Sequence, residues 1–333
     1  MGGFLGFQFL TGAKARMRSI LAAWIMTVWV SAFPLSGTAG FLNYDAREKF
    51  VSTATLVFSD AERRVFEVRM PSARRGFYAS NDTIWGRFYV PARGRGPWPA
   101  VILLPVLAAP NTWIEERFVD ALLSGGSAVF LVELPFQFHR LPRDPRYPSG
   151  ITGLHTGPLF FGRSPQSLAA HAEQAVLDVR RARTWLGRRP EVDGRRVGLL
   201  GVSLGAIVGS VVFVVDDRFQ AGAFFLGGAD FADLIQHSAM TRGVVDRLRL
   251  SPEELSRHLR PFDPRLYRGS GDSRPVLLIN AWFDRVVPRA NARKLKEAFP
   301  RAGQKWIPFG HYTSILAIFW VRQSAARFFS GHL

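Results

Sequence analysis

Short apolar runs typical of buried strands alternate with segments of helical periodicity along most of this chain. Three β-rich segments come first, and they are expected to form antiparallel strands at one edge of a sheet: 51–58, 65–70 and 83–90. Six further apolar runs are expected to be strands: 100–104, 128–133, 197–202, 220–226, 275–280 and 304–308. Because helical segments separate these later runs, the pattern predicts an α/β fold. Its central sheet is mostly parallel, with helices on both faces and an antiparallel N-terminal edge.

Helix boundaries are marked by capping residues. Thr112 and Glu115 have the spacing of a capping box, which predicts a helix from there to about Leu123. Ser164 and Pro165 are N-cap and first-turn residues that predict a long helix. The apolar face of that helix consists of Leu168, Ala172, Ala175, Val179, Ala182 and Leu186.

Two connections are too long to be simple turns. They cover residues 134–163 and 228–272, and the second contains short helical patterns. Both are expected to leave the carboxyl-terminal edge of the sheet, where ligands bind in folds of this class. Long loops at such an edge are often lids or substrate walls, so we expect them to be loop or cap insertions.

Length and composition fit a single large globular domain. The chain has 333 residues, of which 47% are hydrophobic, and residues 40–333 are expected to form one domain. It contains no cysteine, which excludes disulfides, thiolate metal sites and a cysteine nucleophile. No feature of the sequence indicates an oligomeric state.

The N-terminal region has the pattern of a secretory signal. Basic residues at 14–18 precede an uncharged apolar stretch, 20–33, and small residues then lead to a Gly-x-Ala pattern that ends at Ala39. Residues 1–39 are therefore interpreted as a signal or membrane-targeting segment, with Met17 as an alternative start. The protein is expected in the periplasm or outside the cell, and an uncleaved segment that anchors it to a membrane is the alternative.

The formal net charge of +17 raises the question of a nucleic-acid partner. Only five of the 43 basic residues are lysines, and the arginines are scattered, with the densest group at 180–196. This distribution does not predict nucleic-acid binding. It favours an arginine-rich surface that also suits an anionic membrane or acidic ligands, the basis for an expected peripheral membrane association.

Candidate chemistry centres on Gly-Val-Ser-Leu-Gly at 201–205, which lies between the strand run at 197–202 and a helical run at 204–213. The five-residue motif alone is weak evidence for a catalytic serine. A strand, a sharp turn and a helix together, however, would expose the Ser203 hydroxyl above the sheet. A serine of this kind needs a base and an acid. Asp284, which follows the strand at 275–280, is the expected acid.

His311 is the expected base, because it follows the last strand and opens the final helix, 314–329. The order Ser203, Asp284, His311 is that of a nucleophile-elbow triad. Asp230, after the strand at 220–226, is the alternative acid. His139 is interpreted as a plain loop residue, with a place in a substrate loop as the alternative. The remaining histidines have no ligand-like spacing, so no metal is expected.

These motifs resemble those of the α/β-hydrolase superfamily, and of its dienelactone-hydrolase-like and esterase-like bacterial members, over residues 85–333. The resemblance rests on 192–206, 284–288 and Gly310-His311. It implies a serine hydrolase without cofactor that cleaves a small-molecule carboxylic ester, or a related thioester, lactone or amide, through an acyl-enzyme. The alternative is a catalytically silent member that binds a ligand at the membrane surface.

The oxyanion hole departs from the usual glycine-rich pattern. The backbone N–H of Leu204 is the first expected donor. The second should come from Pro105-Val-Leu-Ala-Ala-Pro110, which contains no His-Gly-Gly. Because Pro105 has no N–H, we expect Leu107 to be the donor, with Val106 as the substitute.

Overall fold

The computed structural model describes residues 42–142, 156–248, 250–267 and 272–333. The interpretation of residues 1–39, including Met17 as a start, therefore lies outside the described residues. So do parts of the two long connections, 143–155 in the first and 249 and 268–271 in the second. Among the described residues, no helix is long and apolar enough to span a bilayer.

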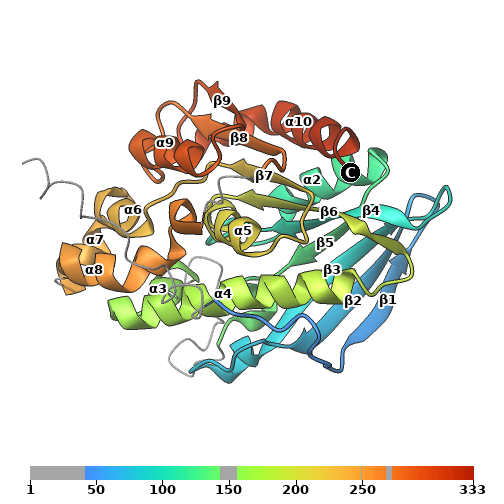
Figure 1. Ribbon diagram of the computed structural model, residues 1–333, viewed down its shortest axis with the longest axis horizontal. Helices are drawn as coiled ribbons and strands as arrows, with labels where there is room; N and C mark the ends of the chain where they lie inside the picture. Colours follow the sequence, from blue (N-terminus) through green and yellow to red (C-terminus); the bar gives the residue numbers. More distant parts are fainter. Residues whose placement is uncertain (1–41, 143–155, 249, 268–271) are drawn as a thin grey trace, which may run out of the picture. The chain divides into compact units, whose positions relative to one another are not determined.

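The strands form one nine-stranded sheet in the order β1-β2-β3-β5-β4-β6-β7-β8-β9 (Figure 1). Their bounds are β1 Thr53–Ser59, β2 Arg63–Pro71, β3 Thr83–Pro91, β4 Trp98–Leu104, β5 Ala128–Val132, β6 Val192–Val202, β7 Ala221–Phe225, β8 Val276–Ala281 and β9 Gly303–Ile307. Strands β1, β2, β3 and β5 pair antiparallel, and every pair from β5 to β9 is parallel. The predicted mostly parallel sheet with an antiparallel N-terminal edge is confirmed.

Helices cover both faces of this sheet, as predicted. Their bounds are α2 Trp113–Ser124, α3 Thr156–Phe161, α4 Pro165–Leu186, α5 Leu204–Val215, α6 Phe231–His237, α7 Arg242–Leu248, α8 Pro252–Leu259, α9 Arg289–Ala298 and α10 Ile318–Ser330. Side chains of β4 alternate between two hydrophobic cores: Ile102 and Leu104 pack in the core with α4 and α5, whereas Val101 and Leu103 pack in the core with α2 and α10.

Helix α4 begins where its capping residues predict. The Ser164 side chain accepts a hydrogen bond from the Ser167 N–H, and Pro165 is the first helical residue. Helix α2 begins at Trp113, after the predicted cap, but its capping box is not formed. Thr112 makes no side-chain cap, and the Glu115 carboxylate instead accepts the N–H of Val106 from a neighbouring loop. A tertiary partner has replaced the local one.

The last helix begins later than predicted. His311 lies in a turn, a 3-10 segment follows at Thr313–Ala317, and α10 starts at Ile318. The Thr313 hydroxyl accepts the Gly310 N–H at 2.8 Å, and the Ser314 hydroxyl donates to the Gly310 carbonyl at 2.6 Å. These local bonds satisfy the backbone in a tight turn and so compete with an immediate α-helix.

The described part of the first long connection is fixed to the core by Arg140. This side chain is fully buried, and its guanidinium donates to Asp178 on α4 at 2.6 Å and to the Asn81 carbonyl at 2.7 Å. The second connection contains α6, α7 and α8, as its short helical patterns predict. Both connections leave the carboxyl ends of strands, β5 and β7.

Candidate active site

Ser203 occupies a sharp turn between β6 and α5. Its φ of 55° is unusual for a residue other than glycine. A Cβ at Gly201 would lie 2.1 Å from the Gly205 carbonyl oxygen, and a Cβ at Gly205 would lie 2.3 Å from that of Leu104. The turn therefore needs glycine at both positions, because three backbone segments meet there.

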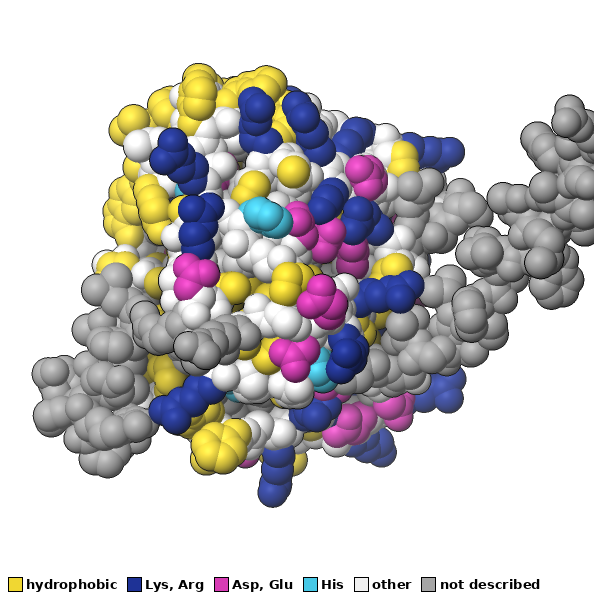
Figure 2. Space-filling view, turned by 90° about the vertical axis from the view of Figure 1, so that its left-hand side faces the viewer, with side chains coloured by type: hydrophobic (Ala, Val, Ile, Leu, Met, Phe, Trp, Pro, Cys, Tyr) yellow, Lys and Arg dark blue, Asp and Glu magenta, His cyan; other side chains and the backbone are white. Residues whose placement is uncertain are grey.

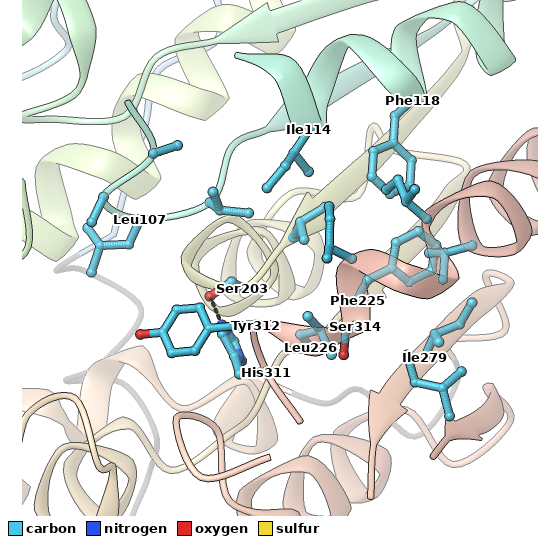
Figure 3. Close-up of a pocket in the computed structure, with 18 of the residues that line it drawn as sticks. Leu107, Ile114, Phe118, Ser203, Phe225, Leu226, Ile279, His311, Tyr312 and Ser314 are labelled. Atoms are coloured by element: carbon cyan, nitrogen blue, oxygen red, sulfur yellow. Dashed lines mark hydrogen bonds between the residues drawn. The ribbon is translucent and has the colours of Figure 1, made fainter. Parts of the chain in front are cut away.

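The structure brings Ser203, His311 and Asp284 together (Figure 3). Ser203 Oγ lies 2.9 Å from His311 Nε2, and His311 Nδ1 lies 2.8 Å from Asp284 Oδ2. The side chains of His311 and Asp284 are only 9% and 3% exposed. With Nδ1–H donating to the carboxylate, Nε2 is free to accept a proton from the hydroxyl.

Asp284 is held by its own turn after β8. Its Oδ1 accepts the N–H groups of Val286 and Val287, each at 2.8 Å, while Oδ2 faces His311. Two backbone donors on one oxygen fix the carboxylate plane. The histidine ring is therefore oriented by a side chain that cannot easily rotate.

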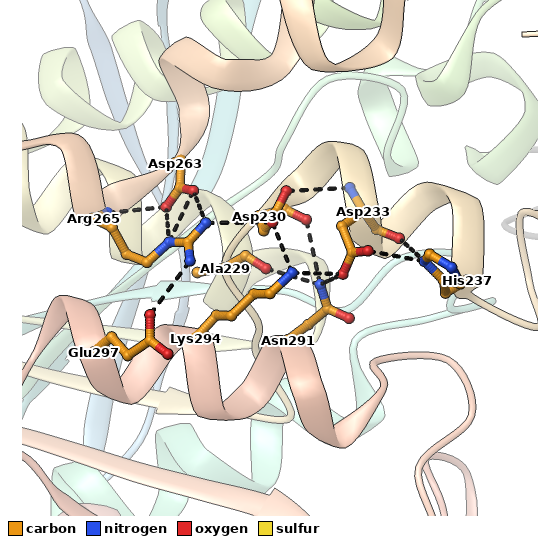
Figure 4. Close-up of polar contacts among 9 residues, drawn as sticks. All are labelled: Ala229, Asp230, Asp233, His237, Asp263, Arg265, Asn291, Lys294 and Glu297. Carbon is orange, nitrogen blue, oxygen red and sulfur yellow. Dashed lines mark hydrogen bonds and ion pairs between the residues drawn. The ribbon is translucent and has the colours of Figure 1, made fainter. Parts of the chain in front are cut away.

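Asp230, the alternative acid, is engaged elsewhere (Figure 4). It caps α6 by accepting the Asp233 N–H, and its Oδ2 lies 2.8 Å from Lys294 Nζ and 3.3 Å from Arg265 Nη2. This network joins α6 to α9 and uses the oxygens that a triad acid would need. Asp284 is the acid that contacts His311.

His139 does not line the cavity at Ser203. Its ring stacks on Trp85 with centroids 4.4 Å apart, and its Nδ1 lies 2.7 Å from Glu133 Oε1. It lines a neighbouring hollow of about 250 Å³ that shares Pro110 with the Ser203 cavity. The hydrogen bond to Glu133 raises the pKa of His139. These contacts explain the residue as part of the loop structure.

In the loop after β4, both backbone polar groups of Val106 are hydrogen-bonded. The Val106 N–H donates to Glu115 Oε1 at 2.9 Å, so the substitute oxyanion donor is already used. The Val106 carbonyl accepts from Gln137 Nε2 at 2.8 Å. In a trans peptide the next N–H points away from that carbonyl, so Gln137 fixes the direction of the Leu107 N–H. No sequence motif marks Gln137, and the spacing of Glu115 had predicted a helix cap instead.

Burial raises the pKa of Glu115 from its ordinary 4.5 to about 7. Between these values the folded protein holds a proton that the unfolded chain releases. The stability that this bound proton contributes is therefore fully present below about pH 4.5. It falls as the pH rises and is lost above about pH 7.

We expect Glu115→Gln to remove this fall while keeping an acceptor for Val106. Its unfolding free energy relative to wild type should rise by roughly 2–3 kcal/mol between about pH 5 and about pH 8. Urea denaturation at both pH values measures the difference. Glu116→Gln, a change at the neighbouring partly exposed carboxylate, retains Glu115 and should keep most of the wild-type fall. Parallel pH profiles for wild type and Glu115→Gln would contradict this account.

A cavity of about 350 Å³ opens at Ser203. Leu107, His311 and Tyr312 lie near the serine, and Phe118 and Ile279 lie at the far end (Figure 3). Most of the lining is apolar, and the second long connection contributes Met240. Among the residues that the structure describes, no three His, Cys, Asp or Glu side chains are grouped to hold a metal ion.

The sequence has a short match to one curated protein. It is 29% identical over 107 residues to "Putative esterase YitV" of Bacillus subtilis, which is 31% of this chain and 42% of that protein. The match thus spans less than half the length of this relative. No protein-family model matches the sequence.

Solved structures match most of the chain. The acetyl xylan esterase from Paenibacillus sp. R4 superimposes with a TM-score of 0.65 and 18% identity over 90% of this chain and 93% of its own. Acetyl xylan esterase 1 from Thermoanaerobacterium sp. JW/SL YS485 superimposes with a TM-score of 0.61 and 16% identity, over 86% of this chain and 92% of its own. The S-formylglutathione hydrolase from Agrobacterium tumefaciens superimposes with a TM-score of 0.58 and 13% identity, over 86% of this chain and 100% of its own. The chain has the α/β-hydrolase fold.

Proposed function

We propose that this protein is a serine hydrolase that cleaves carboxylic esters through an acyl-enzyme. The observation that carries the proposal is the hydrogen-bonded relay from Ser203 Oγ to His311 Nε2 and from His311 Nδ1 to Asp284, at an apolar cavity. The esterase names of the structural neighbours and of the curated relative support the same reaction class.

The first half-reaction forms the acyl-enzyme. Ser203 Oγ attacks the ester carbonyl carbon while His311 Nε2 takes the hydroxyl proton. The N–H groups of Leu204 and Leu107 hold the resulting oxyanion. Leu204 is the first residue of α5, so its N–H has no partner within the helix. Collapse of the intermediate breaks the bond to the alkoxide, which leaves with the proton from His311.

The second half-reaction regenerates the serine. Water attacks the acyl carbon, His311 takes a proton from that water, and the second tetrahedral intermediate expels Ser203, which recovers its proton from the ring. Asp284 stabilises the imidazolium form that appears in both halves and keeps the ring in place. The products are an alcohol and a carboxylic acid.

The apolar lining favours an ester whose acyl part is a hydrocarbon chain. Phe118, Phe225, Ile279, Ile307 and Val321 line the cavity and offer apolar surface to such a chain. The basic and apolar pattern of residues 1–39 further suggests action outside the cytoplasm, in the periplasm or as a secreted enzyme.

A panel of p-nitrophenyl esters tests this substrate class. We expect kcat/KM to rise about fourfold for each methylene from acetate to hexanoate, because each buried CH₂ contributes about 0.8 kcal/mol. Ile279→Phe fills the far end of the cavity (Figure 3) and should end the rise at a shorter chain. Acetate, which does not reach that end, serves as the control for folding. A chain-length profile that is flat, or unchanged in Ile279→Phe, would contradict the assignment of this cavity as the acyl site.

A further inference from the structure

A concentrated apolar surface lies beside the candidate active site. Half of the twelve large hydrophobic side chains that are exposed in the described part of the chain fall between residues 282 and 320. They are Trp282, Phe283, Tyr312, Leu316, Phe319 and Trp320, with exposed fractions from 40% to 72%, and we call them the aromatic face. Solvated aromatic rings in such density are unusual on a freely soluble surface.

These side chains belong to one continuous region. The Trp282 ring lies 5.1 Å from that of Trp306 on β9, and the Phe283 N–H donates to the Phe309 carbonyl at 2.9 Å. Lys305, also on β9, places its Nζ 5.5 Å from the centre of the Trp320 ring on α10. The turn after β8, strand β9 and the start of α10 therefore share this surface.

Cations lie against the aromatic rings. The guanidinium carbon of Arg289 lies 5.1 Å from the Trp282 ring centre, and that of Arg322 lies 4.5 Å from the Phe319 ring centre. Residues 281–333 contain nine Lys and Arg but only two acidic residues. Both acids are engaged, because Asp284 contacts His311 and Glu297 pairs with Arg265. Figure 2 shows hydrophobic and basic side chains intermixed at the upper left, at the height of β9 and α10 in Figure 1.

The aromatic face adjoins the mouth of the Ser203 cavity. Tyr312 belongs to both, since it lines the cavity and is 71% exposed. Further along the same segment, Ile315 and Ile318 line the cavity, whereas Leu316 and Phe319 are exposed. One side of this segment therefore lines the cavity, and the other side is exposed.

We propose that the aromatic face docks the protein onto an anionic phospholipid bilayer. Tryptophan, tyrosine and phenylalanine rings favour the interfacial layer of a membrane, and adjacent basic side chains are attracted to anionic headgroups. Docking through this face brings the mouth of the cavity to the lipid. The inference goes beyond the proposed ester hydrolysis and does not depend on it.

A second copy of the chain fits this surface less well. In a two-fold contact the same patch occurs on both sides, so the cations of one copy would face those of the other. Such an arrangement leaves like charges close together while the rings are buried. An anionic headgroup layer instead supplies the complementary charge.

Vesicle sedimentation of the full chain tests the proposal. The probe is phosphatidylcholine vesicles with about 30% phosphatidylglycerol, compared with pure phosphatidylcholine and with high salt. The test variant combines Phe319→Ser and Trp320→Ser. Its matched control combines Val57→Ser and Phe58→Ser, two exposed apolar side chains on β1 at the opposite edge of the sheet. Thermal unfolding midpoints establish that both variants are folded.

We expect wild type and the β1 control to bind the anionic vesicles equally, and the Phe319/Trp320 variant to lose roughly tenfold or more in partitioning. Lys305→Gln with Arg322→Gln should lose about fivefold for each charge removed. The proposal is overturned if wild type stays unbound, or if the Phe319/Trp320 variant binds as wild type does. It is equally overturned if wild type is a dimer that this variant dissociates, because the occupant is then a second copy.

Discussion

Replacing Ser203 with alanine is expected to lower kcat for a p-nitrophenyl ester by about a million-fold, the order of loss seen when a triad nucleophile is removed. The change deletes the only atom that can form the acyl bond in the proposed mechanism, 2.9 Å from His311 Nε2. Residual hydrolysis would come from the oxyanion donors and from binding alone. Steady-state kinetics at saturating substrate measures the loss.

Ser210→Ala is the matched control for that experiment. Ser210 is also on α5 and fully buried, and its hydroxyl donates to the Ile207 carbonyl at 2.9 Å, so its replacement perturbs the same helix. We expect this variant to keep kcat within a few-fold of wild type. If the two alanine variants lose activity to the same extent, the loss reflects damage to the helix and the nucleophile is not Ser203.

Asp284→Asn is expected to lower kcat by about ten thousand-fold while the protein stays folded. An amide preserves the shape of the side chain but removes the charge that stabilises the imidazolium. Its NH₂ group can also force the wrong tautomer on His311. The two backbone donors from Val286 and Val287 still have an oxygen to bind, so the turn should persist.

Asp230→Asn distinguishes the two acids that the sequence offers. Asp230 pairs with Lys294 and Arg265 and caps α6, so its amide variant should lose stability through a weakened ion-pair network and keep most of its activity. Kinetics and thermal unfolding of both variants separate the two effects. A severe loss of kcat in Asp230→Asn with little loss in Asp284→Asn would reverse the assignment of the acid.

Much of the fold follows from local pattern. Strand runs and caps such as Ser164 lie in elements whose backbone hydrogen bonds are formed locally or with adjacent strands. These elements were therefore predictable. The meeting of Ser203, Asp284 and His311 at one site could be predicted for a related reason. Each residue follows a strand of the parallel sheet, and the carboxyl ends of such strands meet at one edge.

Features that depend on tertiary partners were not predictable. The spacing of Thr112 and Glu115 fits a capping box, but in the fold Glu115 accepts the Val106 N–H from another loop. Gln137 carries no motif, and its role is visible only because its amide reaches the Val106 carbonyl. Those two contacts favour Leu107, the donor already expected from the sequence, over Val106.

The aromatic face escaped prediction for a different reason. Around the start of α10 both sides of the chain are apolar, with Ile318 and Val321 at the cavity and Phe319 and Trp320 in solvent. Periodicity identifies a buried side by its contrast with a polar one, and here that contrast is missing. Only the packed structure shows which apolar side chains remain uncovered.

Covalent labelling with a fluorophosphonate tests the central claim most directly, because the reagent reacts with an activated serine and leaves a stable phosphonyl adduct. Peptide mass spectrometry should find a single adduct on Ser203 of the wild-type protein. The adduct should be absent from Ser203→Ala, and in Asp284→Asn it should form much more slowly than in wild type. A folded wild-type protein that takes up no label, or that carries it on another residue, would contradict the account and leave an α/β-hydrolase fold without this catalytic serine.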